Sequence, residues 1–236
     1  MLEFDRFRAL TFDCYGTLID WERGILTALR GLLRRQGVPC DDERLLTLYA
    51  AFEAEAEAGP YMPYREVLRR VMVRMAAAFS FPLEAADEDC LAASLADWPA
   101  FPDTVAALRR LETRYRLAIV SNVDDDLFAG TRPRLGVDFD VVTTAQQVRS
   151  YKPATAHFTT ALARLGLPPA EVLHVAQSLF HDIPPAKSLG MTTVWVNRRA
   201  GRPGFGATPP ANARPDLEVP DLRSLAALIE EQKRPA

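Results

Sequence analysis

Short apolar runs rich in β-forming residues alternate along this chain with segments of helical periodicity. The runs lie at residues 9–12, 117–120, 140–143, 172–175 and 192–196. Leucines at helical spacing stand between most of them, as at Leu108 and Leu111 or at Leu162 and Leu165. Strands that alternate with helices predict a parallel sheet that is covered by helices on both faces. We therefore expect an α/β fold with a doubly wound parallel sheet.

The stretch between the first two runs interrupts this alternation, because residues 20–98 contain helical patterns and no convincing strand. Asp20 is a suitable N-cap for a first helix, and Asp41 or Asp42 for a second. An all-helical insert in an α/β chain is expected to form a cap over the mouth of an active site. We therefore predict a catalytic core of residues 1–19 and 99–236 and a helical cap domain of residues 20–98.

Two further segments have no part in the predicted core. Residues 53–58 are rich in alanine and glutamate, and we expect them to form the solvated face of a helix. Residues 200–215 are rich in glycine and proline and lack periodicity, so we expect a surface loop.

Composition excludes several classes of function. A formal net charge of −3 disfavours a general binder of nucleic acid or of a membrane surface. The three cysteines, Cys14, Cys40 and Cys90, have unrelated spacings and form neither a metal knuckle nor a disulfide framework. The charged N-terminus has no apolar signal region, and no run approaches the about 18 apolar residues of a membrane helix. We expect a cytoplasmic protein without nucleic-acid or membrane partners.

Polar side chains follow four of the predicted strands. Asp13 comes directly after the first strand, and Ser121 and Asn122 follow the second. Lys152 lies in the loop after the third strand, and Asp182 follows the fourth. Open α/β sheets collect their ligands at the carboxyl ends of the strands, so these side chains are candidates for one site. An aspartate at such a position is a candidate nucleophile.

In the order Asp, Ser-Asn, Lys-Pro, Asp, these segments resemble the motifs of the haloacid dehalogenase-like hydrolase superfamily. The first motif, Phe-Asp-Cys-Tyr-Gly-Thr-Leu at residues 12–18, is highly specific. The resemblance covers nearly the whole chain and implies a Rossmann-like core with an inserted cap. It also implies that Asp13 is the catalytic nucleophile and that Lys152 and Asp182 are catalytic. Lys152 would offset the repulsion between Asp13 and an anionic substrate, while Thr17 and Ser121 would supply hydrogen bonds.

Position 15 distinguishes two branches of the superfamily. Phosphatases carry a second aspartate there, which protonates the leaving alcohol, whereas Tyr15 is a phenol with an ordinary pKa of about 10. A halide leaving group needs no proton, and the dehalogenase branch carries the Asp-x-Tyr-Gly-Thr pattern found here. Phosphatases also place an acidic Mg²⁺ ligand at the position of the neutral Gln177, and Mg²⁺ prefers carboxylate oxygens. Both positions therefore disfavour phosphoryl transfer.

The resemblance extends to substrate binding. In L-2-haloacid dehalogenases a cap arginine and the asparagine after the serine hold the departing halide. Asn122 matches that asparagine, and Arg44 lies at about the right distance along the chain to be the arginine. Tyr15 and Thr17 of the first motif are further substrate-binding candidates, as are three residues near the fourth motif: Gln177, Ser178 and His181.

Together these features predict a hydrolase that displaces halide from a small 2-haloalkanoic acid. By resemblance, Asp13 would attack the halogen-bearing carbon and form an ester, and water oriented by Lys152 and Asp182 would then hydrolyse it. We expect no cofactor, a small anionic substrate and apolar cap helices compatible with a homodimer. One alternative is a phosphatase-like hydrolase with an atypical acid and metal site, which could bind Mg²⁺. Another is a non-catalytic binding protein that keeps the fold.

Overall fold

Six parallel strands form a single sheet in the order β3-β2-β1-β4-β5-β6 in the computed structural model, which describes residues 2–232. The strands are β1 (Ala9–Phe12), β2 (Arg116–Ser121), β3 (Val141–Thr144), β4 (Val172–Ala176), β5 (Thr192–Val196) and β6 (Leu217–Val219). β1 is fully buried and pairs with β2 on one side and with β4 on the other. The strand order reverses at this point, where an open sheet presents its ligand site. The predicted doubly wound α/β sheet is confirmed.

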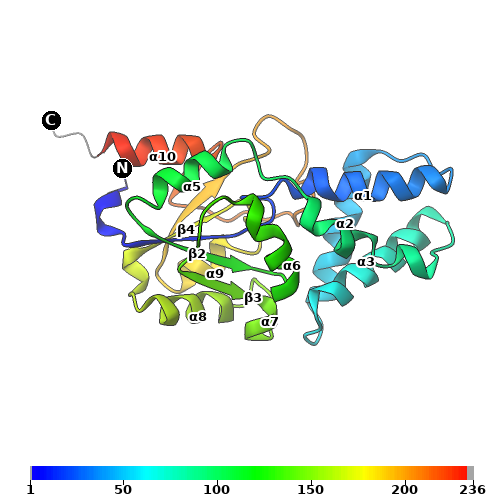
Figure 1. Cartoon of the computed structure of the whole chain (residues 1–236), viewed down its shortest axis with the longest axis horizontal. Coiled ribbons are helices and arrows are strands. Elements are labelled where there is room, and N and C mark those ends of the chain that lie inside the picture. The colour runs from blue at the N-terminus through cyan, green and yellow to red at the C-terminus, as the bar shows by residue number, and fades with distance from the viewer. Residues whose placement is uncertain (1, 233–236) are drawn as a thin grey trace.

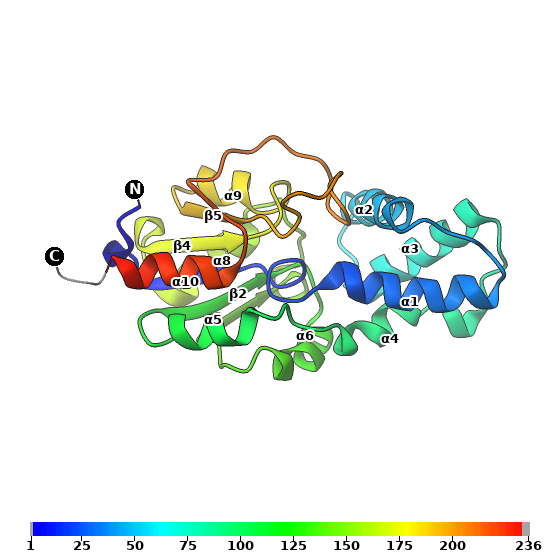
Figure 2. The same ribbon diagram turned by 90° about the horizontal axis from the view of Figure 1, so that it is seen from above.

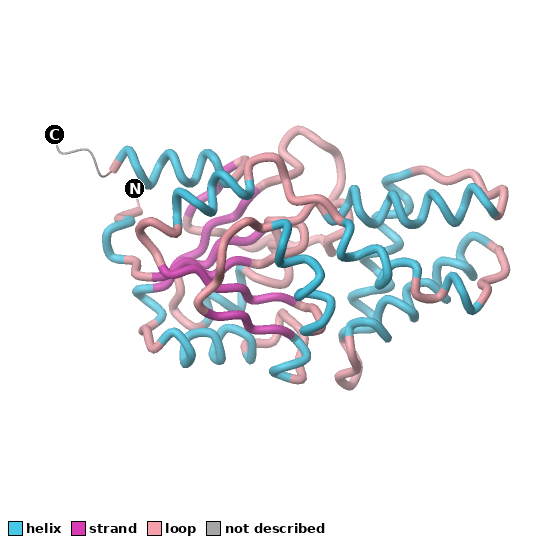
Figure 3. Tube along the Cα trace, viewed as in Figure 1, coloured by secondary structure: helices cyan, strands magenta, loops and turns pink. Residues whose placement is uncertain are grey.

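Helices cover both faces of the sheet (Figures 1 and 3). The core helices are α5 (Thr104–Leu111), α6 (Asp125–Thr131), α7 (Ala145–Val148), α8 (Ala156–Leu165), α9 (Ile183–Ser188) and α10 (Leu222–Glu231). α5 packs against α10 on one face, while α8 lies against β2 and β3 and α9 against β5 on the other. Burial of Val120, Phe158 and Leu165 in one apolar cluster fixes α8 to the sheet.

The sixth strand is absent from the sequence-based prediction. β6 contains only three residues, Leu217–Val219, and pairs with β5 alone at the edge of the sheet. A segment this short has no alternation of apolar and polar residues that could be distinguished from loop. The other five predicted strands agree with the structure to within one residue at each end.

Residues 21–94, which lie between β1 and α5, form a separate group of helices at one end of the sheet (Figure 2). Its helices are α1 (Trp21–Arg35), α2 (Asp42–Glu57), α3 (Tyr64–Phe79) and α4 (Cys90–Ser94). Asp20 accepts a hydrogen bond from the backbone N–H of Arg23, and Asp41, rather than Asp42, caps α2 through the N–H of Arg44. The inserted all-helical cap is confirmed. None of the helices described between residues 2 and 232 has the length and apolarity of a membrane-spanning segment.

Two neighbouring connections join the cap to the core. The N–H of Asp20 donates to the carbonyl of Pro99 over 2.8 Å, and Ile19 forms an isolated bridge with Ala100. The predicted limits of the cap, residues 20 and 98, lie at this junction and stay a prediction.

A core carboxylate caps one of the cap helices. Asp124, in the loop after β2, accepts hydrogen bonds from the backbone N–H groups of Tyr64 (2.9 Å) and Arg65 (3.0 Å) in the first turn of α3. α3 has no local side-chain cap, because its N-cap residue is Pro63. Two of the amides that a helix start leaves without partners are therefore satisfied across the boundary between cap and core.

The long connection between β5 and β6 also contacts the cap. The predicted surface loop, residues 200–215, contains no helix or strand, but Gly206, Ala207 and Thr208 within it are buried. Arg199 is only 8% exposed and pairs with Glu22 of α1 at 2.7 Å and with Glu43 of α2 at 2.8 Å. The lack of periodicity indicates an irregular backbone. It does not show that a charged side chain beside this loop forms ion pairs with two carboxylates of the cap.

The two glycines of α1 allow a matched test of this packing. A Cβ atom on Gly24 would lie 2.2 Å from Cγ of the buried Trp98, whereas a Cβ atom on Gly31 would meet nothing within 4 Å. We expect Gly24→Ala to lower the free energy of unfolding by about 1–3 kcal/mol through overpacking. Gly31→Ala should raise it by up to about 1 kcal/mol through helix propensity. Urea denaturation of both variants measures these shifts, and equal stabilities would contradict the packing of Trp98 on Gly24.

Candidate active site

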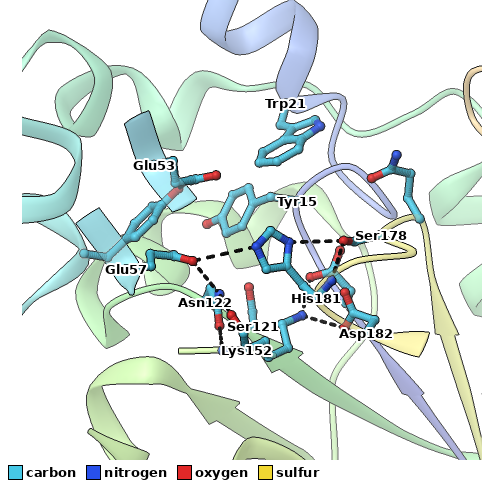
Figure 4. Close-up of a pocket in the computed structure, with 13 residues that line it drawn as sticks. Tyr15, Trp21, Glu53, Glu57, Ser121, Asn122, Lys152, Ser178, His181 and Asp182 are labelled. Carbon is cyan, nitrogen blue, oxygen red and sulfur yellow. Dashed lines mark hydrogen bonds and ion pairs between the residues drawn. The ribbon is translucent and has the colours of Figure 1, made fainter. Parts of the chain in front are cut away.

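Residues from four strand ends and from the cap line one cavity (Figure 4). The core supplies Asp13 after β1, Ser121 and Asn122 at the end of β2, Lys152 after β3 and Asp182 after β4. Other lining residues come from the first motif, the fourth motif and the cap: Tyr15, Trp21, Glu53, Glu57, Tyr64, Gln177, Ser178 and His181. Of the predicted site residues, the structure brings together all except Thr17, which is hydrogen-bonded to Asp13, and Arg44.

Lys152 is the central cation of this cavity. Its side chain is 2% exposed, and Nζ donates to Asp13 Oδ1 (2.9 Å), to Asp182 Oδ1 (2.7 Å) and to the carbonyl of Val120 (3.0 Å). An ammonium group has three protons, so each of them has an acceptor. The ammonium therefore fixes the relative positions of the ends of β1, β2 and β4.

The charges of this triad stabilise one another despite burial. Burial lowers the pKa of Lys152, but the carboxylates of Asp13 and Asp182 more than offset this, and the net shift is upward. Burial raises the pKa of Asp182, yet Lys152 and His174 lower it to about 2 overall. Burial and the nearby carboxylate of Asp182 raise the pKa of Asp13, and Lys152 and Thr17 offset this only in part, so its net shift is upward. At neutral pH Lys152 is cationic and Asp182 is anionic.

The second oxygen of Asp13 is held by the turn that follows it. Thr17 Oγ1 donates to Asp13 Oδ2 over 2.7 Å and accepts the backbone N–H of Gln177 over 2.8 Å. Gly16 adopts φ of +91° in this turn, and a Cβ atom there would lie 2.9 Å from the indole nitrogen of Trp21. The turn thus needs glycine, and it orients Oδ2 of the candidate nucleophile while Lys152 orients Oδ1.

Tyr15 lines the cavity with its ring, while its hydroxyl is engaged elsewhere. The phenol oxygen lies 2.9 Å from Thr131 Oγ1, and the ring meets the edge of Trp98 at a centroid distance of 5.9 Å. Burial raises the pKa of Tyr15 well above its usual range. Tyr15 is therefore a poor proton donor to a leaving group bound at Asp13.

The residues around Gln177 do not suit a magnesium ion. Gln177 Oε1 accepts a hydrogen bond from the hydroxyl of Thr208 over 3.1 Å, and Asp13 and Asp182 both accept from Lys152. Over the described residues, no group of three or more His, Cys, Asp or Glu side chains could hold a metal ion. Mg²⁺ prefers near-octahedral oxygen coordination with a carboxylate, which these already paired groups do not offer.

Asn122 joins the loop of Lys152 to the cap. Its Oδ1 accepts the backbone N–H of Lys152 (2.8 Å), and its Nδ2 donates to the carbonyl of Lys152 (3.2 Å) and to Glu57 Oε2 (3.1 Å). Ser121, only 1% exposed, has a hydroxyl without a hydrogen-bond partner among the described residues. This hydroxyl is available to a ligand in the cavity.

His181 bridges the fourth motif and the cap (Figure 4). Its Nδ1 lies 3.1 Å from Ser178 Oγ, and its Nε2 lies 3.8 Å from Glu57 Oε2. Burial lowers the pKa of His181 to about 4, so the imidazole is neutral at physiological pH. Lys152 is then the one side chain with a full positive charge among those that line this cavity.

Comparison with known proteins agrees with this geometry. A family model described as haloacid dehalogenase-like hydrolase matches residues 7–190, which is most of the chain and includes the cap and all four motifs. This chain belongs to the haloacid dehalogenase-like hydrolases.

Individual relatives of this hydrolase include dehalogenases and phosphatases. (S)-2-haloacid dehalogenase 4A of Burkholderia cepacia is 24% identical over 213 residues, 87% of this chain and 89% of that protein. Validoxylamine A 7'-phosphate phosphatase of Streptomyces hygroscopicus subsp. limoneus is 28% identical over 190 residues, 75% and 78% of the two chains. The solved structure of the L-2-haloacid dehalogenase PA0810 superposes with a TM-score of 0.79 at 25% identity, covering 95% and 99% of the two chains.

Arg44 does not reach the cavity of this haloacid dehalogenase-like hydrolase. It is exposed in the first turn of α2, and its guanidinium lies 5.0 Å from the ring centroid of Phe79. Two other arginines of the cap, Arg65 and Arg69, pair with Asp126 and Asp89. Arg44 lies on a helix that lines the cavity, but it is the last turns of α2, with Glu53 and Glu57, that do so and not the first.

The prediction of a solvated face for residues 53–58 is wrong for two glutamates. Glu53 is 4% exposed, the side chain of Glu57 is 5% exposed, and both line the cavity. A signal for them was present in the sequence, because Tyr49, Glu53 and Glu57 follow one another at four-residue spacing. They continue the buried face of α2 that begins at Leu45.

Glu53 should make the stability of the hydrolase depend on pH. Burial raises its pKa from 4.5 to about 7, so between these values the unfolded chain loses a proton that the folded chain retains. The free energy of unfolding therefore falls as pH rises from 4.5 to 7. In Glu53→Gln this contribution is absent, so the variant should gain stability relative to wild type over this range, on the order of a few kcal/mol.

Urea denaturation at several pH values measures the difference. Glu55→Gln on the same helix is the matched control, because Glu55 is exposed and pairs with Arg74. Wild type and Glu53→Gln with the same dependence on pH would contradict the burial of an ionisable Glu53.

Proposed function

We propose that this hydrolase displaces halide from a small 2-haloalkanoic acid by nucleophilic attack of Asp13, without a metal ion. The observation that carries the proposal is the surroundings of Asp13. Lys152 and Thr17 orient its carboxylate, while position 15 offers a phenol bound to Thr131 in place of an acid. Halide leaves as an anion and needs no proton, so this arrangement is sufficient for carbon–halogen cleavage.

The reaction would proceed in two balanced steps. In the first, an oxygen of Asp13 forms a bond to the halogen-bearing carbon, the carbon–halogen bond breaks, and halide departs with the bonding electrons. In the second, water attacks the carboxyl carbon of Asp13, the ester bond breaks, and the hydroxy acid, a proton and the free carboxylate result. Asp182 Oδ2, which no described residue hydrogen-bonds, is available to orient that water. Lys152 would stabilise the charge that develops on Asp13.

The cytoplasmic location and the homodimer expected from the sequence are also part of this proposal. Cys14, Cys40 and Cys90 are all free thiols in the structure, which is compatible with the cytoplasmic location expected from the sequence. The homodimer stays a prediction.

Single turnover in water enriched in heavy oxygen tests the mechanism. With enzyme in excess over 2-chloropropionate, the heavy oxygen should enter the side chain of Asp13, because water attacks the aspartyl carboxyl carbon rather than the substrate. Mass spectrometry of the peptide containing Asp13 detects the label. Halide release should persist in the presence of a chelator and fall to the uncatalysed level in Asp13→Asn, a loss of at least about 10³-fold.

Other outcomes would favour the rival functions. Label confined to the hydroxy acid would contradict the ester on Asp13. Mg²⁺-dependent turnover of an aryl phosphate, abolished by Asp13→Asn and without any halide release, would instead support a phosphatase. Stabilisation by ligands without turnover of either substrate would support a binding protein.

A further inference from the structure

The charges that line the catalytic cavity are strongly unbalanced. Four carboxyl groups line it, from Asp13 and Asp182 of the core and from Glu53 and Glu57 of α2, against the single ammonium of Lys152. The protons of Lys152 are already taken by Asp13, Asp182 and a backbone carbonyl. The two cap glutamates therefore have no cationic partner within the cavity.

Glu57 lacks a hydrogen-bond donor for one of its oxygens. Oε2 accepts from Asn122 at 3.1 Å, but Oε1 is buried without a partner among the described residues. A buried polar atom without a hydrogen-bond partner is destabilising, and more so when it is charged. Together with the unpartnered hydroxyl of Ser121 in the same cavity, this oxygen marks a place where a ligand would supply the missing donor.

Glu53 is held in place as an acceptor. The hydroxyls of Tyr49 (2.9 Å) and Tyr64 both donate to Glu53 Oε1, and these hydrogen bonds favour the ionised form against the effect of burial. A carboxyl group with a pKa of about 7 is ionised in about half of the molecules at neutral pH. A cation that enters the cavity would be attracted to the charge of Glu53 and would increase its ionisation.

A second, larger cavity continues from this point. The catalytic cavity encloses about 30 Å³, and its neighbour about 420 Å³, with Glu57, Lys152 and His181 lining both. The neighbour also contains the rings of Tyr61 and Tyr151, which stack at a centroid distance of 5.6 Å. Arg149 lines this larger cavity and lies over the ring of Tyr61, 4.6 Å from its centroid. The ring of Tyr61 is thus already engaged by Tyr151 and Arg149, and the larger cavity contributes room for a ligand beside Glu57.

We propose that the substrate carries an ammonium group, bound by Glu53 and Glu57 at the boundary of the two cavities, in addition to the carbon that Asp13 attacks. This inference rests on the proposed function and specifies its substrate class: a haloacid that is also an amine. A simple haloalkanoate would add a further negative charge to a cavity that already holds an excess of carboxyl groups. Burial and the nearby Glu53 raise the pKa of Glu57, so an ammonium group bound between the two glutamates would favour their ionised forms and would supply a donor to Glu57 Oε1.

Two substrates with the same reacting carbon test the inference. 2-Chloropropionate and 3-amino-2-chloropropionate differ only in the ammonium group, and halide release is measured for each against an Asp13→Asn blank. We expect kcat/KM to be at least about tenfold higher for the amino compound, which corresponds to about 1.4 kcal/mol. In the Glu53→Gln/Glu57→Gln variant this preference should disappear. In Glu55→Gln, a control on the exposed side of α2, it should remain.

The outcomes separate this inference from the function on which it rests. Equal efficiency for both compounds, or an unchanged preference in the double variant, would overturn the ammonium site and leave the dehalogenase intact. If the double variant does not fold, the ratio of kcat/KM for the two compounds in wild type still tests the ammonium site.

Absence of halide release from both compounds would instead overturn the proposed function. The ammonium site is then tested by unreactive analogues, 3-aminopropionate and propionate, through the shift that each causes in the Tm of wild type. Stabilisation by the amino compound alone, lost in the double variant, would support the site. Equal shifts by both compounds would overturn it.

Discussion

The buried ammonium of Lys152 is the interaction on which the rest of the site depends. It links the ends of β1, β2 and β4 through Asp13, Val120 and Asp182. A buried charge is tolerable only when its partners are fully arranged, and removal of one partner from such a group typically costs about 3–5 kcal/mol. The ion pairs that orient Asp13 thus also hold the carboxyl edge of the sheet together, so the geometry of the candidate site and the stability of that edge are coupled.

The cap adds two carboxyl groups to this centre, which already contains two carboxylates and one ammonium. Glu53 and Glu57 face the core without a cation of their own, and burial raises the pKa of both carboxyl groups. The core therefore supplies a candidate nucleophile that is paired with a cation, and the cap supplies an acidic wall that is not. Under the proposed function, the chemistry would belong to the core and the recognition of substrate to the cap.

The sequence predicts the core of the site better than its cap for a geometric reason. Parallel strands end at one edge, so Asp13, Lys152 and Asp182 meet wherever the individual loops run. A helix of the cap has no such constraint, because its periodicity defines a buried face but not which turn of it reaches the cavity. Arg44 and Glu57 lie on the same helix, and only packing against the core selects Glu57. β6 is not predicted for another reason: its three residues are too few to show the alternation of apolar and polar side chains that indicates a strand.

The carboxylate of Asp124 has a consequence for turnover. Because it caps α3 from the core, any movement that lifts α3 away leaves the amides of Tyr64 and Arg65 without their acceptor. Loss of a helix cap costs about 1 kcal/mol. The contact between α3 and the core is accordingly favoured, and any movement of the cap during turnover would have to break it. Such a step would be governed by a helix start that touches no reacting atom.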